Sequence, residues 1–394
     1  MRGGAEHSQD PSRLSPPANE IGIVAGEASG DLLGSLLIRS LRGAGLATGF
    51  RGIAGAKMQG LGARSLFPME ALSVRGYVEA LGSLRGILNI RKRLAKELIA
   101  HPPRLFIGVD APDFNLALEA RLKKAGIPTV HFVSPSIWAW RGGRIKKIRH
   151  AVSHMLLIFP FEDEIYRRAG IPATYVGHPL AHALPEKPDR MAARERLKLR
   201  PDREYLALLP GSRVGELKAL AGLFVATAAR LAEQRPGLQF LVPLVNRETR
   251  QLFETALHKA GRELPLRILF GHAHDALQAA DLALVASGTA TLEALLLGCP
   301  HVITYRVPWL TWQIMRRQAY LPWVGLPNIL ARRDLVPELL QEQARPEVLA
   351  DALLRLLDDR AERERMRQGF DELRASLRRD TPRLIAHALR PYLT

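Results

Sequence analysis

The apolar positions of this chain gather in short runs that alternate with longer segments of helical periodicity. Four runs fall in the first half, at Ile21–Ala25, Leu105–Val109, Thr129–Val133 and Met155–Phe159, with helical segments such as Asp31–Arg42 and Leu116–Ala125 between some of them. A second series follows at Tyr205–Leu209, Gln239–Pro243, Arg267–Phe270, Leu282–Ala286 and His301–Tyr305. Strands that alternate with helices are typical of parallel sheets with helices on both faces. The pattern therefore predicts an α/β protein of two Rossmann-like domains, with a ligand cleft between the carboxyl ends of their strands.

The boundaries of these domains follow from composition. The Pro-rich, polar stretch 178–190 separates the two series and is the best candidate for a linker. We expect residues 21–182 and 183–365 to form the two domains, and residues 366–394 to form C-terminal helices that pack on the first domain or swap between subunits. Residues 1–20 are rich in Pro, Ser and Gly and lack an apolar segment, which predicts a disordered extension and not a signal peptide.

Composition narrows the class of protein. The chain has 394 residues, of which 47% are hydrophobic and 24% charged, as in ordinary globular proteins. A single cysteine, Cys299, excludes an internal disulfide and fits a reducing compartment. No run approaches 18 consecutive apolar residues, so we expect no membrane-spanning segment.

The net charge of +17 indicates an anionic partner, which could be nucleic acid, a membrane surface or a phosphorylated substrate. The basic residues are not interleaved with a known nucleic-acid-binding module, so we expect no nucleic acid. One dense stretch has helical order: its apolar face carries Leu81, Leu84 and Leu88, an adjacent face carries Arg85 and Lys92, and Arg91 interrupts the apolar stripe. Such a helix suits a membrane interface, although a surface helix packed on the core is the plainer interpretation.

The segment DLALVASGTATLEALLLGCP, residues 281–300, carries the first candidate site. An apolar strand ends in Ser287-Gly288-Thr289, and a helix begins there. The free N–H groups and the dipole of a helix start make an anion site, which suits a nucleotide diphosphate. Glu293 lies on the same helix face as Thr289, where its carboxylate could bind a ribose diol. An ordinary strand–turn–helix is the alternative.

A second candidate is Asp110, which directly follows the strand LFIGV in GVDAPDFN. A carboxylate at the carboxyl end of a strand is well placed to accept a proton from a substrate hydroxyl. Asp113 is the alternative base, or the N-cap of the next helix. In the Gly-rich segment IGIVAGEASGD, Glu27 and Asp31 are further candidates, and Asp31 could instead cap the helix that follows.

The loop after Leu209 reads LLPGSRVGE and places Arg213 where a departing diphosphate needs positive charge. No Asp-x-Asp motif is present, and neither His272 with His274 nor His150 with His154 has the acids or cysteines of a metal site. The sequence therefore predicts no metal and no cofactor, with donors and a helix dipole in place of a cation.

In this order, the motifs VAGEASGD, GVDAPDFN, VSPSIWAWR, GHPL, LLPGSR, VPLVN, ASGTATLEAL and LPNIL resemble those of the lipid-A-disaccharide synthase family. The resemblance covers nearly all of residues 20–390 and implies the GT-B architecture of two Rossmann-like domains. It implies an inverting glycosyltransferase that joins UDP-2,3-diacylglucosamine to the 6-hydroxyl of 2,3-diacylglucosamine 1-phosphate. The products are the β-1,6-linked disaccharide 1-phosphate and UDP.

The resemblance also assigns roles to single residues. Asp110 matches the proposed base, and the nucleotide-side positions are matched by Arg213, Ser287, Gly288, Thr289, Glu293 and Asn328. Spacing alone gives Asn328 no role. Glu27, Ser29 and Asp31 match the N-terminal Gly-rich loop, and the region 72–98 matches a membrane-contact surface, although Arg75 stands where an apolar residue is expected.

The implied setting is the cytoplasmic face of the inner membrane, where a peripheral enzyme meets acylated substrates on an anionic surface. The sequence leaves open whether the protein forms a homodimer. The rival interpretations are another GT-B UDP-sugar enzyme, such as a UDP-N-acetylglucosamine epimerase, a membrane-bound scaffold without UDP affinity, and a nucleic-acid binder.

Overall fold

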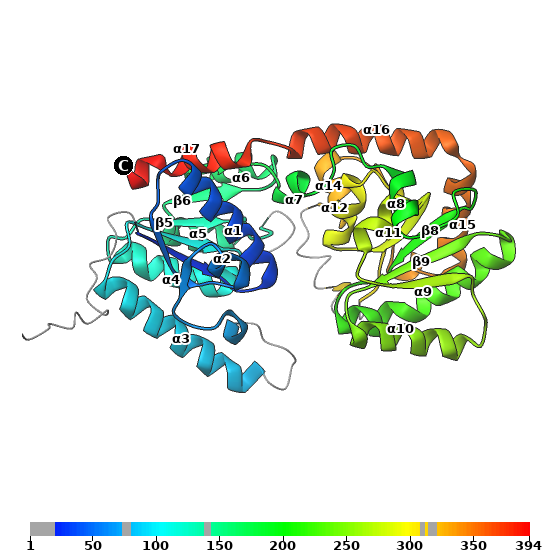
Figure 1. The fold of residues 1–394 in the computed structure, drawn as a ribbon, viewed down its shortest axis with the longest axis horizontal. Coiled ribbons are helices and arrows are strands. Elements are labelled where there is room, and N and C mark those ends of the chain that lie inside the picture. Colours follow the sequence, from blue (N-terminus) through cyan, green and yellow to red (C-terminus); the bar gives the residue numbers. More distant parts are fainter. Residues whose placement is uncertain (1–19, 73–79, 138–142, 308–311, 314–320) are drawn as a thin grey trace, which may run out of the picture.

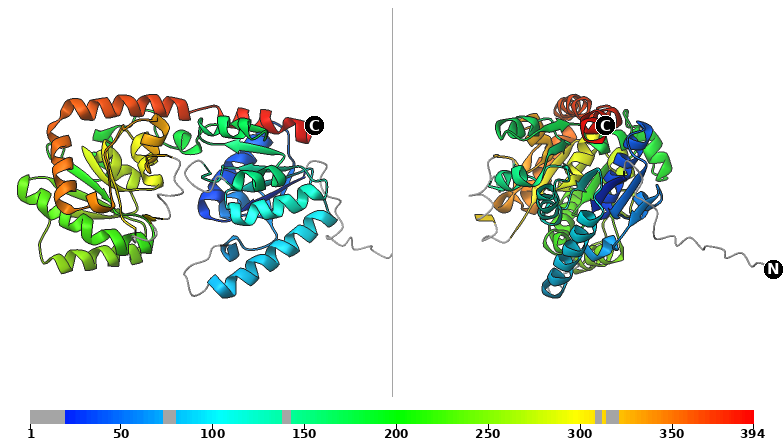
Figure 2. Two further views of the ribbon diagram at one scale, coloured as in Figure 1. Left: turned by 180° about the vertical axis from the view of Figure 1, so that it is seen from behind. Right: turned by 90° about the vertical axis from the view of Figure 1, so that its left-hand side faces the viewer.

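A computed structural model of the chain describes residues 20–72, 80–137, 143–307, 312–313 and 321–394 (Figure 1). These residues form two lobes that lie side by side along the longest axis of the molecule (Figures 1 and 2). Each lobe is built on one sheet whose strands all run parallel, with helices packed against it. This confirms the prediction of two parallel-sheet α/β domains.

The sheet of the N-terminal lobe has seven strands in the order β3-β2-β1-β4-β5-β6-β7. Its strands are β1 (Glu20–Ala25), β2 (Gly49–Ile53), β3 (Ala63–Ser65), β4 (Leu105–Val109), β5 (Thr129–Phe132), β6 (His154–Leu157) and β7 (Ala173–Tyr175). The helices that precede the second sheet are α1 (Ala28–Gly43), α2 (Ala56–Gln59), α3 (Ala80–Ala100), α4 (Pro112–Lys124), α5 (Arg144–Ala151), α6 (Glu162–Arg168), α7 (Pro179–Ala183) and α8 (Arg190–Arg196), with a 3-10 turn at Met69–Leu72. All five residues of β4 are buried, as expected for a strand covered on both faces.

The sheet of the C-terminal lobe has six strands in the order β10-β9-β8-β11-β12-β13. Its strands are β8 (Tyr205–Leu209), β9 (Gln239–Leu244), β10 (Leu266–Phe270), β11 (Leu282–Ala286), β12 (His301–Tyr305) and β13 (Glu338–Leu340). Its helices are α9 (Val214–Gln234), α10 (Arg247–Ala260), α11 (Ala273–Ala279), α12 (Thr289–Leu296), α14 (Leu326–Ala331), α15 (Pro346–Asp358) and α16 (Arg360–Leu377), with a 3-10 turn at Gln341–Gln343. Both sheets thus share the strand order of a doubly wound, dinucleotide-type fold.

The chain crosses between the lobes twice. The first crossing contains α7, inside the stretch that the sequence predicts as a linker. The second joins α16 to α17 (Thr381–Leu393), which packs against α1 of the N-terminal lobe. In Figure 1, α16 (orange) and α17 (red) lie along the same side of the molecule, and α3 lies on the opposite side of the N-terminal lobe. The two crossings touch, since the His178 N–H donates to the Leu377 carbonyl at 2.9 Å.

The expected strands are confirmed, with small differences at their ends. β5 ends at Phe132 and not at Val133, because Val133 has φ +81° and cannot continue a strand. The predicted runs do not include β2, β3, β7 and β13. The apolar pattern of β2 is interrupted by Arg51 and two glycines. The other three strands have only three residues each and pair at the outer edge of their sheet, so they carry little of the apolar signal that marks a buried strand.

Candidate functional site

The candidate residues of both lobes follow the strands at which the strand order of each sheet reverses. In the N-terminal sheet, β1 and β4 are neighbours, and their loops carry Glu27 and Asp110. In the C-terminal sheet, β8 and β11 are neighbours, and their loops carry Arg213 and Ser287. Ligands of parallel α/β sheets bind at the carboxyl ends of strands at such reversal points. The topology therefore indicates one candidate ligand-binding position in each lobe, made from the loops that the sequence singles out.

Asp110 follows β4 with a backbone that non-glycine residues rarely adopt. Its φ is +52° and that of Ala111 is +44°, so two successive residues are left-handed. The Asp110 N–H donates to the Phe132 carbonyl at 2.9 Å, and Asn115 Nδ2 donates to the Asp110 carbonyl at 2.8 Å. Such residues cost about 1–3 kcal/mol each and persist where the surroundings impose them, often at functional sites. The half-buried Asp110 is a functional candidate on this independent ground.

A buried polar pair lies beneath this turn. Glu119 of α4 and His131 of β5 are fully buried, and Glu119 Oε1 lies 2.7 Å from His131 Nδ1. Glu119 also packs against the backbone of Gly108 in β4, where a Cβ atom would come within 2.1 Å of Oε1. Burial raises the pKa of Glu119, and the neighbouring His131 offsets part of this rise. Within the described chain, Glu119 Oε2, His131 Nε2 and Asn115 Oδ1 have no hydrogen-bond partner. The sequence gives no sign of this pair.

The Gly-rich loop after β1 divides its residues between surface and core. Glu27 and Ser29 are exposed at the start of α1, and the α-carbon of Gly26 lies against the side chain of Ala111. Asp31 is only 4% exposed, and its two oxygens accept N–H groups of Lys57 (2.8 Å) and Met58 (3.0 Å). Asp31 therefore caps α2. The alternative prediction, that Asp31 caps the helix directly after the Gly-rich segment, is wrong. Glu27 and Ser29 remain the accessible members of the predicted set.

The loop between β8 and α9 holds Arg213 at the surface. Glu216 Oε2 accepts the N–H groups of Ser212 (2.9 Å) and Arg213 (3.2 Å), which fixes the first turn of α9. The Arg213 side chain is 81% exposed, and its Nη1 lies 3.3 Å from Glu216 Oε1. Because exposed ion pairs contribute about 0–1 kcal/mol, the guanidinium can turn toward a ligand at little cost. Arg213 is the N-cap residue of α9 and Glu216 its N3 residue, so Glu216 closes the first turn without the Ser or Thr that marks a capping box in a sequence.

The loop between β11 and α12 forms an open helix start. Gly288 has φ +155° and, like Thr289, is exposed, while Ser287 is half-buried. Ser287 Oγ donates to the Val324 carbonyl at 3.4 Å, and buried Thr291 donates through Oγ1 to the Gly288 carbonyl at 2.8 Å. The N-cap residue of α12 is Gly288, which has no side chain to cap the first turn. The loop therefore keeps N–H groups at the surface, as the anion-site prediction requires.

Glu293 is not isolated on the helix face. Its Oε2 lies 3.3 Å from Nε2 of His274, which belongs to α11. The hydrogen bond to Glu293 raises the pKa of His274, while partial burial opposes the rise. His274, which the sequence analysis discounts as a metal ligand, is therefore a neighbour of Glu293, the predicted ribose contact.

Asn328 lies inside the C-terminal lobe at 1% exposure. Its Nδ2 donates to the Val336 carbonyl and to Glu338 Oε1, both at 2.9 Å, and its Oδ1 accepts the N–H groups of Leu335 (2.8 Å) and Val336 (2.9 Å). Glu338 in turn accepts the N–H groups of Val324 and Gly325, beside Ser287. Burial raises the pKa of Glu338, and these N–H donors oppose the rise. Asn328 therefore supports the predicted nucleotide site by holding the Val324–Gly325 segment through Glu338, and not by contact with a ligand.

The helix α3, which is expected to contact the membrane, is buried toward its C-terminal end and exposed in the turns that precede this end. Leu94, Ala95 and Leu98 are fully buried, whereas Leu88 is 47% exposed. Arg85 and Lys92 are exposed, and half-buried Arg91 donates to the Asp113 carbonyl at 3.3 Å. Leu81 and Leu84 belong to α3, but their side chains lie outside the described ones, and Arg75, Trp138 and Trp140 lie outside the described residues.

Two adjoining hollows open on this side of the N-terminal lobe. The first, of 250 Å³, is lined by Leu88, Arg91 and Lys92 of α3 together with residues of α4. The second, of 430 Å³, lies between α4 and α5 and is lined by basic residues that include Lys146 and Lys147. Positive charge therefore continues from α3 across α5. In the described ranges, no helix is long and apolar enough to cross a membrane, and no group of three or more His, Cys, Asp or Glu residues is arranged to hold a metal ion.

The structure thus brings the predicted residues together in two separate sets. The first joins the Asp110 turn to the Gly26–Glu27 loop, and the second joins Ser287 to the loop held by Asn328. No hydrogen bond or ion pair links one set to the other among the residues with described positions.

Comparisons with known proteins add a sequence relationship. A family profile described as lipid-A-disaccharide synthetase matches residues 21–389. A lipid-A-disaccharide synthase of Methylobacillus flagellatus is 56% identical over 374 residues, covering 95% of this chain and 99% of that protein. One from Azoarcus sp. is 57% identical over 378 residues, covering 96% of this chain and 97% of that protein.

Solved structures share the fold at low identity. UDP-GlcNAc 2-epimerase from Neisseria meningitidis, bound to UDP-GlcNAc, has a TM-score of 0.61 at 13% identity and covers 94% of this chain and 98% of its own. The glycotransferase of kitacinnamycin has a TM-score of 0.61 at 15% identity, covering 96% of this chain and all of its own (100%). These likenesses concern the two-domain architecture alone.

Proposed function

The chain belongs to the lipid-A-disaccharide synthase family and is a glycosyltransferase, and we propose that its substrates are UDP-2,3-diacylglucosamine and 2,3-diacylglucosamine 1-phosphate. The product is the β-1,6-linked disaccharide 1-phosphate, and UDP leaves. The observation that carries the proposed chemistry is the strained, half-buried Asp110 at the carboxyl end of β4, in the loop that neighbours the Gly-rich turn.

Asp110 acts as the general base. Its carboxylate takes the proton of the acceptor 6-hydroxyl while the oxygen attacks the anomeric carbon of the donor. A single displacement from the face opposite UDP inverts the α-linked donor to a β product. Glu27 and Ser29, exposed at the start of α1, are the polar groups that orient the acceptor.

The C-terminal lobe holds UDP and stabilises its departure. The N–H groups at Gly288 and Thr289 and the positive end of α12 meet the diphosphate, and the exposed Arg213 adds a full charge. Glu293 accepts from the ribose hydroxyls, with His274 as its protein partner when no nucleotide is bound. The proposed mechanism requires no metal ion, because Arg213, the N–H groups and the dipole of α12 supply the positive charge that the departing diphosphate needs.

The enzyme works at the inner face of the inner membrane. Exposed Leu88 supplies apolar contact, and the basic side chains of α3 and α5, including Arg85 and Lys92, attract anionic lipid. Each well-placed cation adds about 1 kcal/mol to binding at such a surface. In Figure 1, α3 lies opposite α16 and α17, so this face is clear of both crossings between lobes.

Two matched variants test the base. Asp113 lies three residues after Asp110, in the first turn of α4, but its side chain is 86% exposed and paired with Arg144 at 2.6 Å. Purified Asp110→Asn and Asp113→Asn are assayed with both acylated substrates, and the product is identified by its mass. We expect normal folding of both variants, loss of transfer in the first and retention in the second. Near-normal turnover of Asp110→Asn overturns the assignment of the base.

The same assay separates this function from its rival. A UDP-sugar epimerase would turn over UDP-N-acetylglucosamine without an acceptor and without detergent or lipid, whereas the proposed enzyme requires the acylated donor. We also expect EDTA to leave transfer intact. A reversible loss of activity with EDTA would contradict the metal-free account.

A further inference from the structure

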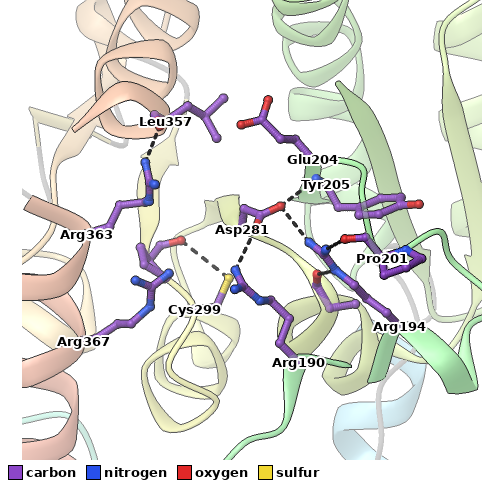
Figure 3. A network of polar contacts seen from close by, with 12 residues as sticks. Arg190, Arg194, Pro201, Glu204, Tyr205, Asp281, Cys299, Leu357, Arg363 and Arg367 are labelled. Atoms are coloured by element: carbon purple, nitrogen blue, oxygen red, sulfur yellow. Dashed lines mark hydrogen bonds and ion pairs between the residues drawn. The ribbon is translucent and has the colours of Figure 1, made fainter. Parts of the chain in front are cut away.

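A cavity of 930 Å³ opens on the C-terminal lobe, away from the loops described above. Its wall includes Arg190, Asp281, Cys299, Arg363 and Arg367, and we refer to it as the arginine cavity (Figure 3). Asp281 directly precedes β11, whereas Ser287 directly follows that strand. At about 3.3 Å per residue, the two residues lie roughly 20 Å apart along the strand. The arginine cavity is therefore at the amino edge of the sheet, opposite the proposed UDP site.

The charges that line the arginine cavity do not balance. Six cationic side chains face three acidic ones; the cations are Lys187, Arg190, Arg360, Arg363, Arg367 and Arg374, and the acids are Asp281, Glu364 and Asp371. Each acid is already engaged, and Asp281 alone pairs with two arginines, Arg190 at 2.6 Å and Arg194 at 2.8 Å. Lys187 and Arg360 have no ion pair among the residues that the structure describes. The lining thus keeps an excess of positive charge.

Three of these arginines, Arg190, Arg363 and Arg367, also interact through their charges. Arg363, half-buried on α16, donates through Nη1 to the carbonyls of Leu356 and Leu357, which fixes its guanidinium at the end of α15. Burial lowers the pKa of Arg363, and the charges of Arg367 and Arg190 add to this effect, while the carboxylates of Asp281 and Glu204 oppose it. Burial also raises the pKa of the Cys299 thiol to about 12, so it supplies no negative charge. Figure 3 shows these side chains converging from α16 and from the β11 side.

We propose that the arginine cavity binds a phosphate-bearing anion. Guanidinium groups match phosphate oxygens with paired N–H donors, and an anion between Arg190, Arg363 and Arg367 would neutralise their mutual repulsion. The volume of the cavity exceeds that of an inorganic phosphate and suits a small phosphorylated molecule. This site is separate from the donor site and does not depend on the proposed reaction.

The position of the arginine cavity gives such an anion a structural consequence. Lys187 and Arg190 belong to the segment that enters the C-terminal lobe, while Arg363 and Arg367 belong to α16, which leaves it. Arg374, at the same wall, donates to the Glu186 carbonyl at 3.3 Å. A bound anion therefore ties the segment that enters the C-terminal lobe to α16, and we expect it to stabilise the protein against unfolding.

The probe is inorganic pyrophosphate, titrated into the full-length protein by calorimetry at constant ionic strength, with sodium sulfate as a second anion. Arg367 has only an exposed partner, Glu364 at 3.3 Å, so Arg367→Gln is expected to fold. Arg365→Gln is the matched control, because Arg365 lies on the same helix but pairs with Glu362 outside the cavity. Lys187→Gln gives an independent change in the other wall.

We expect saturable binding to the wild type and to Arg365→Gln, with affinity reduced at least tenfold in Arg367→Gln and in Lys187→Gln. Arg213→Gln distinguishes the donor site: binding that is lost in Arg213→Gln and kept in Arg367→Gln overturns the proposal. Absence of saturable binding to the wild type, or equal affinity in all variants, overturns it as well. The readout is binding, so a failed transferase assay leaves this test unaffected.

Discussion

Breaking the buried Glu119–His131 pair from one side is expected to destabilise the N-terminal lobe by about 3 kcal/mol or more. Both side chains are 0% exposed and 2.7 Å apart, so neither can turn to water when its partner is removed. Glu119→Met and His131→Leu each keep most of the volume but leave the other polar group buried. A loss of this size is a large part of the 5–15 kcal/mol that typically separates folded from unfolded protein.

Replacing both residues together is expected to cost much less than the sum of the single changes. The double variant removes both members of the pair, so neither is left buried without the other, and it substitutes apolar contact, which is often nearly neutral. We therefore expect a coupling free energy of about 2 kcal/mol or more between the two positions. The size of this coupling free energy comes from the cost of leaving one polar group buried without its partner. The loss of one hydrogen bond alone would amount to only about 1 kcal/mol.

The assay is urea unfolding of the wild type, both single variants and the double variant, followed by circular dichroism in one buffer near neutral pH. Free energies of unfolding from the four proteins give the coupling directly. Additive losses would refute this reasoning, because they would mean that the two groups act independently. An equal slope with urea in all four proteins is the control that the unfolded states are comparable.

Three further outcomes follow from the structure. Burial lowers the pKa of His301 to about 4. As the pH falls below 6.5, this histidine therefore takes up a proton in the unfolded chain before it does so in the folded one, and about 3 kcal/mol of the free energy of unfolding is lost between pH 6.5 and 4. His301→Phe should reduce this loss, measured by urea titrations at pH 7.5 and 5. Asn328→Ala leaves the buried N–H groups of Leu335 and Val336 and the Val336 carbonyl without their partner and should cost at least about 3 kcal/mol of unfolding free energy; an unchanged urea midpoint would contradict the structural role of Asn328. Leu88→Asp should weaken co-flotation with anionic vesicles, whereas Met191→Asp, which alters a similarly exposed residue of the C-terminal lobe, should not.

The regular part of the site was accessible from the sequence because it depends on local pattern. β4 and β11 are continuous apolar runs, and the polar residues that follow them must emerge at the carboxyl edge of the sheet. Asp110 and Ser287 are therefore located once the strands are recognised. The order of the strands then sets the loops of Glu27 and Arg213 beside them.

The long-range contacts were not accessible in this way. Asp31 caps a helix 25 residues further on, and the sequence cannot say which distant N–H groups a carboxylate will meet. Asn328 stands in a motif, yet nothing in LPNIL reveals that its side chain points into the lobe and holds Glu338. The Glu119–His131 pair links a helix to a strand across the core, and each residue alone looks like an ordinary polar position.

The packing of α17 against α1 affects how the chain is made on the ribosome. The N-terminal sheet is complete once β7 has emerged, but α17 follows only after roughly 200 further residues have been synthesised. At ordinary rates of translation this interval lasts about 10–40 s. During that time the face of α1 that α17 will cover stays open to water, to other nascent chains and to chaperones. Full burial of the first lobe therefore depends on the release of the last helix.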